Sequence, residues 1–322
     1  MRDRRFPIAR ILLLVACVAP RGAAAAESPG PSEPRSLSIG GRSRSYRIYA
    51  PKTLPGNAPA ALVLVFHGGD GDGAGAERLT GFSALAEREG FLVAYPDGVG
   101  KHWNDGRDFP DSQAYRENVD DVAFAASLID RISREHTVDV DRVFATGFSN
   151  GGIFAHYLAA RLAGRIAAIA SVSGGIAKPF DKLFRPERPV SVLIIHDVGD
   201  PLVPYHGGGV GPRRTNGQVV DTEEAVRLWV AADGGSAKAA TDLPPDIDPK
   251  NGCSVERGRW SGGRDGTEVV LYTTRGGGHT WPGGPQYAPQ ALVGKVCREF
   301  DGTRTIWEFF RRHPKRRAEK LP

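Results

Sequence analysis

Residues 139–152, DVDRVFATGFSNGG, decide the fold of this chain. They contain the pentapeptide G-x-S-x-G, centred on Ser149. An apolar run at 143–146 precedes it and predicts a buried strand, and residues 153–159 predict a helix. A strand, this pentapeptide and a helix form a nucleophile elbow, which exposes a serine hydroxyl at a helix N-terminus. The alternative is an ordinary Ser-Gly turn.

Apolar runs of strand length recur on both sides of this turn. They occupy residues 60–66, 91–95, 166–172, 190–195 and 268–273. Helical patterns lie at 77–88, 118–136, 222–232 and 303–312. Continuous apolar strands that alternate with helices predict an α/β fold with a mostly parallel sheet and helices on both faces. An alternating segment at 36–49 predicts an antiparallel hairpin, and residues 243–263, rich in Pro and Gly, are expected to be irregular.

The first 26 of the 322 residues resemble an export signal rather than part of the fold. Four arginines precede a short apolar run, and alanines at 23–26 offer a cleavage site. The segment around Cys17 resembles a bacterial lipobox, so a lipid anchor at Cys17 is the alternative to a secreted or periplasmic protein. No other segment is apolar and long enough to predict a transmembrane helix. We expect a linker at 27–35, one catalytic domain at 36–313 and a basic tail at 314–322.

The net charge of +5 is concentrated at the two ends of the chain. Residues 1–26 hold five Arg and one Asp, and residues 311–322 hold six basic residues and one Glu. The body between them is acidic, so no basic stripe predicts a nucleic-acid partner. The tail is expected to be solvated. No metal-binding motif is present and no cofactor is expected.

A serine hydroxyl needs a base, and that base needs a carboxylate to fix its tautomer. His279 follows the last predicted strand within GGGHTWPGG and is the predicted base. The acid is expected after the strand at 190–195, where Asp200 is preferred and Asp197 is the alternative. His206 is a weaker candidate for the base. The remaining histidines are expected to pack or to shape loops: His67, His102, His136, His156, His196 and His313.

Backbone N–H groups near the serine should stabilise the oxyanion that forms during acyl transfer. One expected donor is Asn150, directly after the serine. The other is Gly69, in the glycine loop HGGDGDG that follows the strand at 60–66. The alternative for that loop is a plain turn.

Several motifs together resemble the secreted polyhydroxybutyrate depolymerase-like esterases. They are LVLVFHGGDGDG at 62–73, YPDG at 95–98, VDDVAF at 119–124, GFSNGG at 147–152, HDVGDPLVPYHGG at 196–208 and GGGHTWPGG at 276–284. This group is similar to the feruloyl and acetylxylan esterases of carbohydrate esterase family 1. The resemblance implies an α/β-hydrolase fold in which Ser149, Asp200 and His279 act together, in the chain order Ser, Asp, His. One departure is Asp197, where the family more often has glycine.

The resemblance implies a serine carboxylic-ester hydrolase that forms an acyl-enzyme. The expected substrates are polyhydroxybutyrate-type oligoesters or related esters, and the alternatives are feruloyl or acetyl esters of plant polysaccharide. A serine peptidase of the same fold and a binding protein without activity are further alternatives. Trp103, Trp281 and Tyr115 are candidates to contact a substrate or to pack the loops.

Two cysteines remain after the signal segment, Cys253 and Cys297. They bracket the last predicted strand and the His279 loop. Export into an oxidising compartment favours a disulfide between them, and two unrelated thiols are the alternative.

Overall fold

The computed structural model describes residue 30 and residues 32–316, apart from 53, 55–57, 245, 246, 248 and 249. The predicted signal segment, Cys17 and the tail from residue 317 lie outside the described residues. Among the residues described, no helix is long and apolar enough to cross a membrane.

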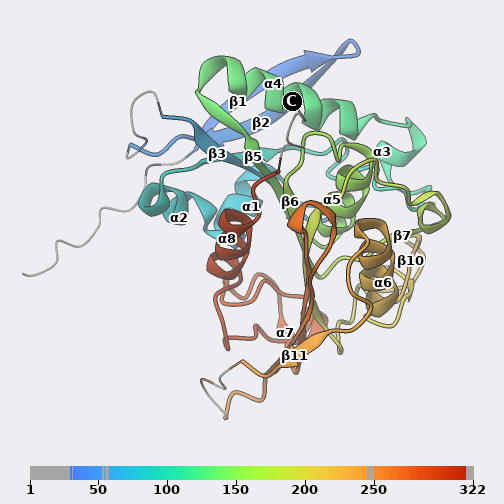
Figure 1. Ribbon diagram of the computed structural model, residues 1–322. Coiled ribbons are helices and arrows are strands. Elements are labelled where there is room, and N and C mark those ends of the chain that lie inside the picture. The colour runs from blue at the N-terminus through green and yellow to red at the C-terminus, as the bar shows by residue number, and fades with distance from the viewer. Residues whose placement is uncertain are drawn as a thin grey trace, which may run out of the picture.

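A ten-stranded sheet forms the centre of the molecule (Figure 1). Its strand order is β1-β2-β4-β3-β5-β6-β8-β13-β12-β11. The six central strands, β4 to β13 in this order, are mutually parallel, and the strands at both edges are antiparallel. The strands are β1 Glu33–Ile39, β2 Arg42–Tyr49, β3 Ala60–Phe66, β4 Leu92–Pro96, β5 Val138–Phe148, β6 Ala168–Val172, β8 Ser191–Asp197, β11 Ala240–Asp242, β12 Ser254–Trp260 and β13 Val269–Arg275. The sheet is therefore the predicted mostly parallel sheet of an α/β-hydrolase.

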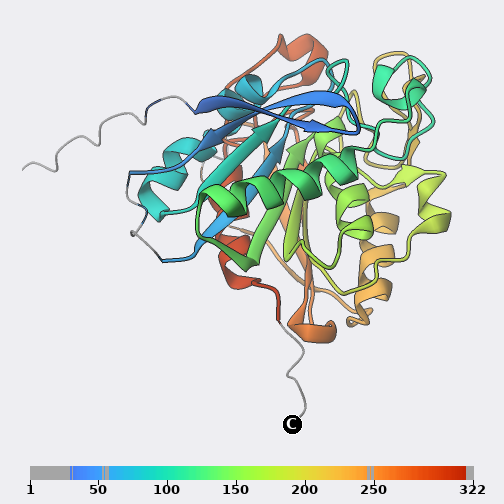
Figure 2. The same ribbon diagram turned by 90° about the horizontal axis from the view of Figure 1, so that it is seen from above.

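Helices cover both faces of this sheet (Figures 1 and 2). One face packs against α4, α5 and α6, and the other packs against α1, α2 and α8. The helices are α1 Gly73–Thr80, α2 Phe82–Glu89, α3 Gln113–Arg116, α4 Asp121–Glu135, α5 Asn150–Arg161, α6 Thr222–Asp233, α7 Gln290–Val293 and α8 Gly302–Arg312. The central strand β3 is buried along its whole length, as its continuous apolar sequence predicts.

A smaller three-stranded sheet lies outside the main one. It joins β7 (Ala177–Lys178), β10 (Gln218–Val219) and β9 (Gly208–Gly209) in that order. The pairing holds the segment after Asp200 against the segment that follows β6.

The structure confirms the predicted hairpin and corrects two other predicted elements. The hairpin around Gly40 is confirmed, although β1 begins at Glu33, within the predicted linker. The helix predicted at 77–88 is two helices, because Gly81 adopts a left-handed conformation between α1 and α2. The prediction of an irregular segment at 243–263 is wrong, since β12 lies within it and pairs with β13.

The described residues after α8, 313–316, contact the body of the molecule through Lys315. Lys315 donates from its backbone to the carbonyl of Asp141, 2.7 Å away, and from its ammonium to the carbonyls of Ala163 and Ile166. Desolvation first, and the charge of Arg188 second, lower the pKa of Lys315 to about 8. The prediction of a solvated tail is therefore wrong at this residue.

Cys253 and Cys297 form a disulfide, with their Cα atoms 5.6 Å apart. The bond ties the start of β12 to the segment that precedes α8. The last strand and the His279 loop both lie within the covalent ring, as their sequence positions predict.

Candidate active site

Ser149 lies between β5 and α5, on a turn with φ 56° and ψ −120°. The backbone of the turn is so tight that a Cβ on Gly147 would overlap the carbonyl of Gly151. A Cβ on Gly151 would in turn overlap the carbonyl of Phe66, at the end of β3. Both glycines are therefore required by close backbone approach. This is the geometry of a nucleophile elbow.

Asp200 and His279 reach the same edge of the sheet as Ser149. The strands β5, β6, β8 and β13 are parallel neighbours, so their carboxyl ends meet at that edge. Asp200 follows β8 and His279 follows β13. The carboxyl ends of parallel strands are where ligands bind in sheets of this kind.

A buried hydrogen bond joins His279 to Asp200. The Nδ1 atom of His279 lies 2.8 Å from Oδ2 of Asp200. The Oδ1 atom of the same carboxylate accepts the backbone N–H groups of Leu202 and Val203, each at 2.8 Å. Burial by itself opposes ionisation of Asp200, but the charges and hydrogen bonds of His279 and His196 outweigh it and hold the pKa well below its usual range. The carboxylate is thus fixed with one oxygen facing the imidazole.

Asp197, the alternative acid, has different partners. Its Oδ2 atom accepts the hydroxyl of Thr274 and the backbone N–H of Gly277, each at 2.8 Å. Its Oδ1 atom accepts the N–H of Gly199 at 2.8 Å. Asp197 therefore ties the loop after β8 to the base of the His279 loop, and Asp200 is the carboxylate that contacts the imidazole.

The imidazole of His279 lies beside the elbow. Its ring centroid is 4.8 Å from that of Phe148, the residue before Ser149. The backbone N–H of His279 donates to the carbonyl of Val293 at 2.7 Å, which holds the loop in place from the other side. The elbow, the imidazole and the carboxylate therefore form one cluster.

The two expected oxyanion donors lie next to each other. A Cβ on Gly69 would be 3.9 Å from the Cβ of Asn150 and 2.9 Å from Nε2 of His102. A Cβ on the preceding Gly68 would be 3.4 Å from that of Ser149. Asn150 begins α5, and the first N–H groups of a helix have no partner within the helix. The residues that carry the two expected donors are therefore neighbours of Ser149.

The aromatic residues considered for substrate contact separate into two groups. Trp103 and Trp281 are only 2% and 1% exposed. Trp103 stacks on Phe154 and donates to the carbonyl of His67, and Trp281 donates to Thr303. A substrate role for these two rings is therefore wrong, because core packing encloses both.

Tyr115 is exposed on α3, where its hydroxyl donates to Asp108 at 2.6 Å. Tyr287, which was not among the sequence candidates, packs against the residue that precedes the serine. Its ring packs edge-on against Phe148 at 5.6 Å and is 44% exposed. Burial first, and the charge of Asp200 second, raise the pKa of its hydroxyl. Its position in the loop after His279 was the available sequence signal.

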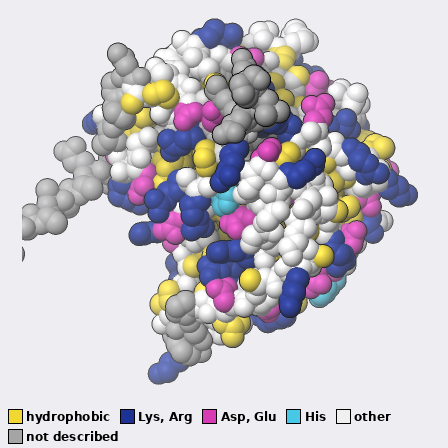
Figure 3. Space-filling view, in the orientation of Figure 1, with side chains coloured by type: hydrophobic (Ala, Val, Ile, Leu, Met, Phe, Trp, Pro, Cys, Tyr) yellow, Lys and Arg dark blue, Asp and Glu magenta, His cyan; other side chains and the backbone are white. Residues whose placement is uncertain are grey.

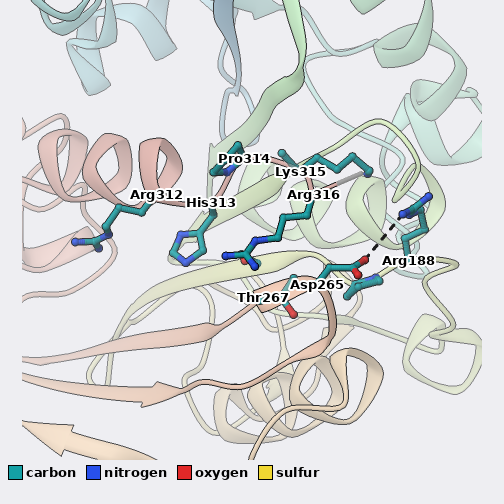
Figure 4. A pocket seen from close by; sticks show the side chains of 12 residues that line it. Arg188, Asp265, Thr267, Arg312, His313, Pro314, Lys315 and Arg316 are labelled. Atoms are coloured by element: carbon teal, nitrogen blue, oxygen red, sulfur yellow. Dashed lines mark ion pairs between the residues drawn. The ribbon is translucent and has the colours of Figure 1, made fainter. Parts of the chain in front are cut away.

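Hollows of about 90 and 320 Å³ lie at the opposite edge of the sheet. The smaller one is lined by Ala167 and Ser191, where β6 and β8 begin, and by the chain after α8. Figure 3 shows Lys and Arg side chains gathered around this part of the surface. In Figure 4 Arg188 and Arg316 lie on opposite sides of Asp265, and the contact between Arg188 and Asp265 is 3.9 Å. These hollows are separate from the Ser149 cluster.

Comparisons with known proteins agree with this geometry. Residues 44–181 match the family described as esterase PHB depolymerase. The putative esterase NocK of Nocardia uniformis subsp. tsuyamanensis is 34% identical over 85% of this chain and 81% of its own length. Feruloyl esterase C of Emericella nidulans is 26% identical over 80% of this chain and 90% of its own length. The structure of an acetyl xylan esterase from Aspergillus awamori has the same fold, with a TM-score of 0.55 at 17% identity over 77% and 94% of the two chains.

The fold and these relatives place the chain among the carboxylic ester hydrolases of the α/β-hydrolase fold. Within that class, the chain belongs to the esterase PHB depolymerase family.

Proposed function

We propose that the protein is an exported serine esterase that forms an acyl-enzyme on Ser149. The observation that carries this proposal is the buried hydrogen bond from His279 Nδ1 to Asp200 Oδ2, at 2.8 Å, beside the elbow serine. It leaves Nε2 of His279 as the atom that can accept the proton of the serine hydroxyl.

Each step follows from the positions of these side chains. Ser149 attacks the ester carbonyl carbon as His279 takes its proton, and the carbonyl oxygen becomes an oxyanion. The N–H groups of Asn150 and Gly69 stabilise that charge. His279 then returns the proton to the leaving alcohol, and the acyl-enzyme remains. A water molecule, deprotonated by His279, releases the acid and restores the serine.

The substrate class that we propose is a hydroxybutyrate-type oligoester or a related short ester. The matching family model supports this choice. A feruloyl ester is the second candidate. It is favoured by Tyr287, whose partly exposed ring beside Phe148 could stack on an aromatic acyl group, and by the named activity of the fungal relative.

Export is part of the same proposal. The basic and apolar pattern of residues 1–26 supports it, as does the disulfide, which persists in oxidising compartments. A secreted or periplasmic location follows, with the lipid anchor at Cys17 as the alternative.

Fluorophosphonate labelling tests the mechanism. The reagent should modify Ser149 and abolish hydrolysis of p-nitrophenyl acetate, and Ser149→Ala should neither label nor hydrolyse. Labelling at another residue, or retained activity in Ser149→Ala, would contradict the proposal. A panel of hydroxybutyrate oligomers, methyl ferulate and acetylated xylan then ranks the substrates, and an aminoacyl-nitroanilide tests for peptidase activity.

A further inference from the structure

The side chain of Asn150 is not part of the chemistry described above, yet it is buried and fully engaged. Its Oδ1 atom accepts the backbone N–H of Trp103 at 2.9 Å. Its Nδ2 atom donates to Oδ2 of Asp105 at 2.6 Å and to the carbonyl of Trp103 at 3.3 Å. The residue directly after the serine thus clamps the main chain of a loop 47 residues earlier in the sequence.

Asp105 decides which way this amide points. A carboxylate accepts hydrogen bonds and donates none, so it selects the NH₂ group of Asn150 and turns the amide oxygen toward Trp103. Asp105 is itself buried and paired with Arg107, whose Nη2 atom lies 2.8 Å from Oδ2. Arg107 also donates to the carbonyl of Asn216 at 2.9 Å, beside the small outer sheet. Arg107 therefore holds the same carboxylate oxygen that accepts the amide of Asn150.

The clamped loop touches the other half of the proposed oxyanion hole. His102, the neighbour of Trp103, covers Gly69, where an added Cβ would be 2.9 Å from its Nε2 atom. The carbonyl of Lys101 accepts the N–H of Asp70 at 3.0 Å. One loop, residues 101–103, thus contacts Asn150 on one side and residues 69 and 70 on the other.

We propose that Asp105 is a positioning residue that sets the oxyanion hole through the side chain of Asn150. Asn150 contributes its backbone N–H to the hole, and its amide fixes the loop that packs on Gly69. Asp105 holds that amide in the orientation in which its oxygen accepts the backbone N–H of Trp103. The inference rests on the proposed function, since it assigns these contacts to the same reaction.

Asp121, the first residue of α4, provides a matched control that holds the same loop. It is a buried aspartate paired with a buried arginine, Arg44, at 2.7 Å. Its second oxygen accepts the backbone N–H of Asn104 at 2.8 Å. Asp121 thus holds the loop as Asp105 does, but its carboxylate bonds to Arg44 and Asn104 rather than to Asn150.

The test compares Asp105→Asn, Asn150→Ala, the double variant and Asp121→Asn. Each is assayed with p-nitrophenyl acetate and with a trifluoromethyl ketone, whose adduct on the serine mimics the oxyanion. Rates are expressed per site titrated by fluorophosphonate, so that unfolded protein does not count. In Asp105→Asn we expect kcat to fall by about 10- to 100-fold, with KM within about threefold, because a misplaced donor acts on the transition state.

Three further results are expected. The inhibition constant of the ketone should rise by the same factor as kcat/KM falls. Asn150→Ala, which keeps the backbone N–H, should lose as much activity, and adding Asp105→Asn to it should cost nothing more, since Asp105 acts through Asn150. Asp121→Asn should keep kcat within about threefold, even where its melting temperature falls.

Unchanged kcat in Asp105→Asn, an equal loss in Asp121→Asn, or additive losses in the double variant would each overturn the inference. If Asp105→Asn yields no titratable protein, the test rests on Asn150→Ala, because that variant leaves the Asp105–Arg107 ion pair intact. Full activity of Asn150→Ala would then refute the inference. A wild-type protein that neither labels at Ser149 nor hydrolyses the ester would instead refute the proposed function.

Discussion

Replacing Asp200 by asparagine should invert the tautomer of His279. The Oδ1 atom of Asp200 accepts two backbone N–H groups, from Leu202 and Val203. In Asp200→Asn only the amide oxygen can take that place, so the NH₂ group must face Nδ1 of His279. An NH₂ group there donates to Nδ1 and forces the ring proton onto Nε2, the atom that should accept the proton of Ser149.

The expected loss in kcat is about 10⁴-fold, or about 5 kcal/mol of activation free energy. Asp197→Asn provides the comparison. One carboxylate oxygen of Asp197 accepts from Gly199, and the other accepts from Thr274 and Gly277. An amide has only one acceptor oxygen, so Asp197→Asn would lose the hydrogen bonds on one of these two sides. We expect a loss of about 3 kcal/mol in the free energy of unfolding, but no change of tautomer and a much smaller loss of kcat.

Turnover per fluorophosphonate-titrated site and urea denaturation separate the two effects. Asp200→Asn should be nearly inactive, whereas Asp197→Asn should be active but less stable. A larger loss of kcat in Asp197→Asn would reverse the assignment of the acid, and equal activity in both variants would refute the tautomer reasoning.

Three further predictions concern other parts of the molecule. Reducing the Cys253–Cys297 disulfide should lower the free energy of unfolding by about 4 kcal/mol and lower activity at temperatures where the fold is intact; unchanged activity would show that the bond does not support the His279 loop. Burial raises the pKa of Asp233 from 3.8 to about 7, so the folded state binds this proton more tightly and stability should fall as pH rises from about 4 to about 7. The melting temperature of Asp233→Asn should fall less than that of the wild type over that interval. An identical pH profile would contradict the attribution of the fall to Asp233. Tyr287→Ala should raise KM for methyl ferulate more than for p-nitrophenyl acetate, whereas Tyr287→Phe should leave both KM values unchanged. An equal rise for the two substrates in Tyr287→Ala would contradict an aromatic subsite at this residue.

The sheet was predictable because its central strands bury both faces. A strand such as β3, AALVLVF, carries no polar residue, so it can be located from the sequence alone. The antiparallel strand β12, SVERGRW, is half exposed and carries three charged residues, so its sequence does not distinguish it from a loop. Its pairing with β13 and β11 makes it a strand, and local sequence patterns do not show such pairing.

The residues proposed to carry the reaction were identified for a similar reason. Ser149, Asp200 and His279 each follow an apolar strand, and the ends of parallel strands converge. For Trp103 the sequence left substrate contact and packing open, because an aromatic residue in a glycine-rich loop resembles a surface contact; the loop folds inward and stacks the indole on Phe154. The contact between Asn150 and Asp105 joins residues 45 positions apart, and no local sequence pattern predicts it.

The exposure of Leu243, directly after β11, has a consequence for the integrity of the polypeptide. Leu243 is 77% exposed, and exposed segments of this kind are where proteases cut. A cut after Leu243 would give two polypeptides, one with Ser149 and Asp200 and the other with His279. The disulfide lies within the second piece and does not tie the two together, so their union would rest on noncovalent contacts, which include the ladders β8–β13 and β11–β12 and the packing of α8 on the sheet. Such a nicked molecule would be a heterodimer that shares one proposed catalytic centre, and the two halves, produced separately, would report their reassociation by regaining hydrolysis.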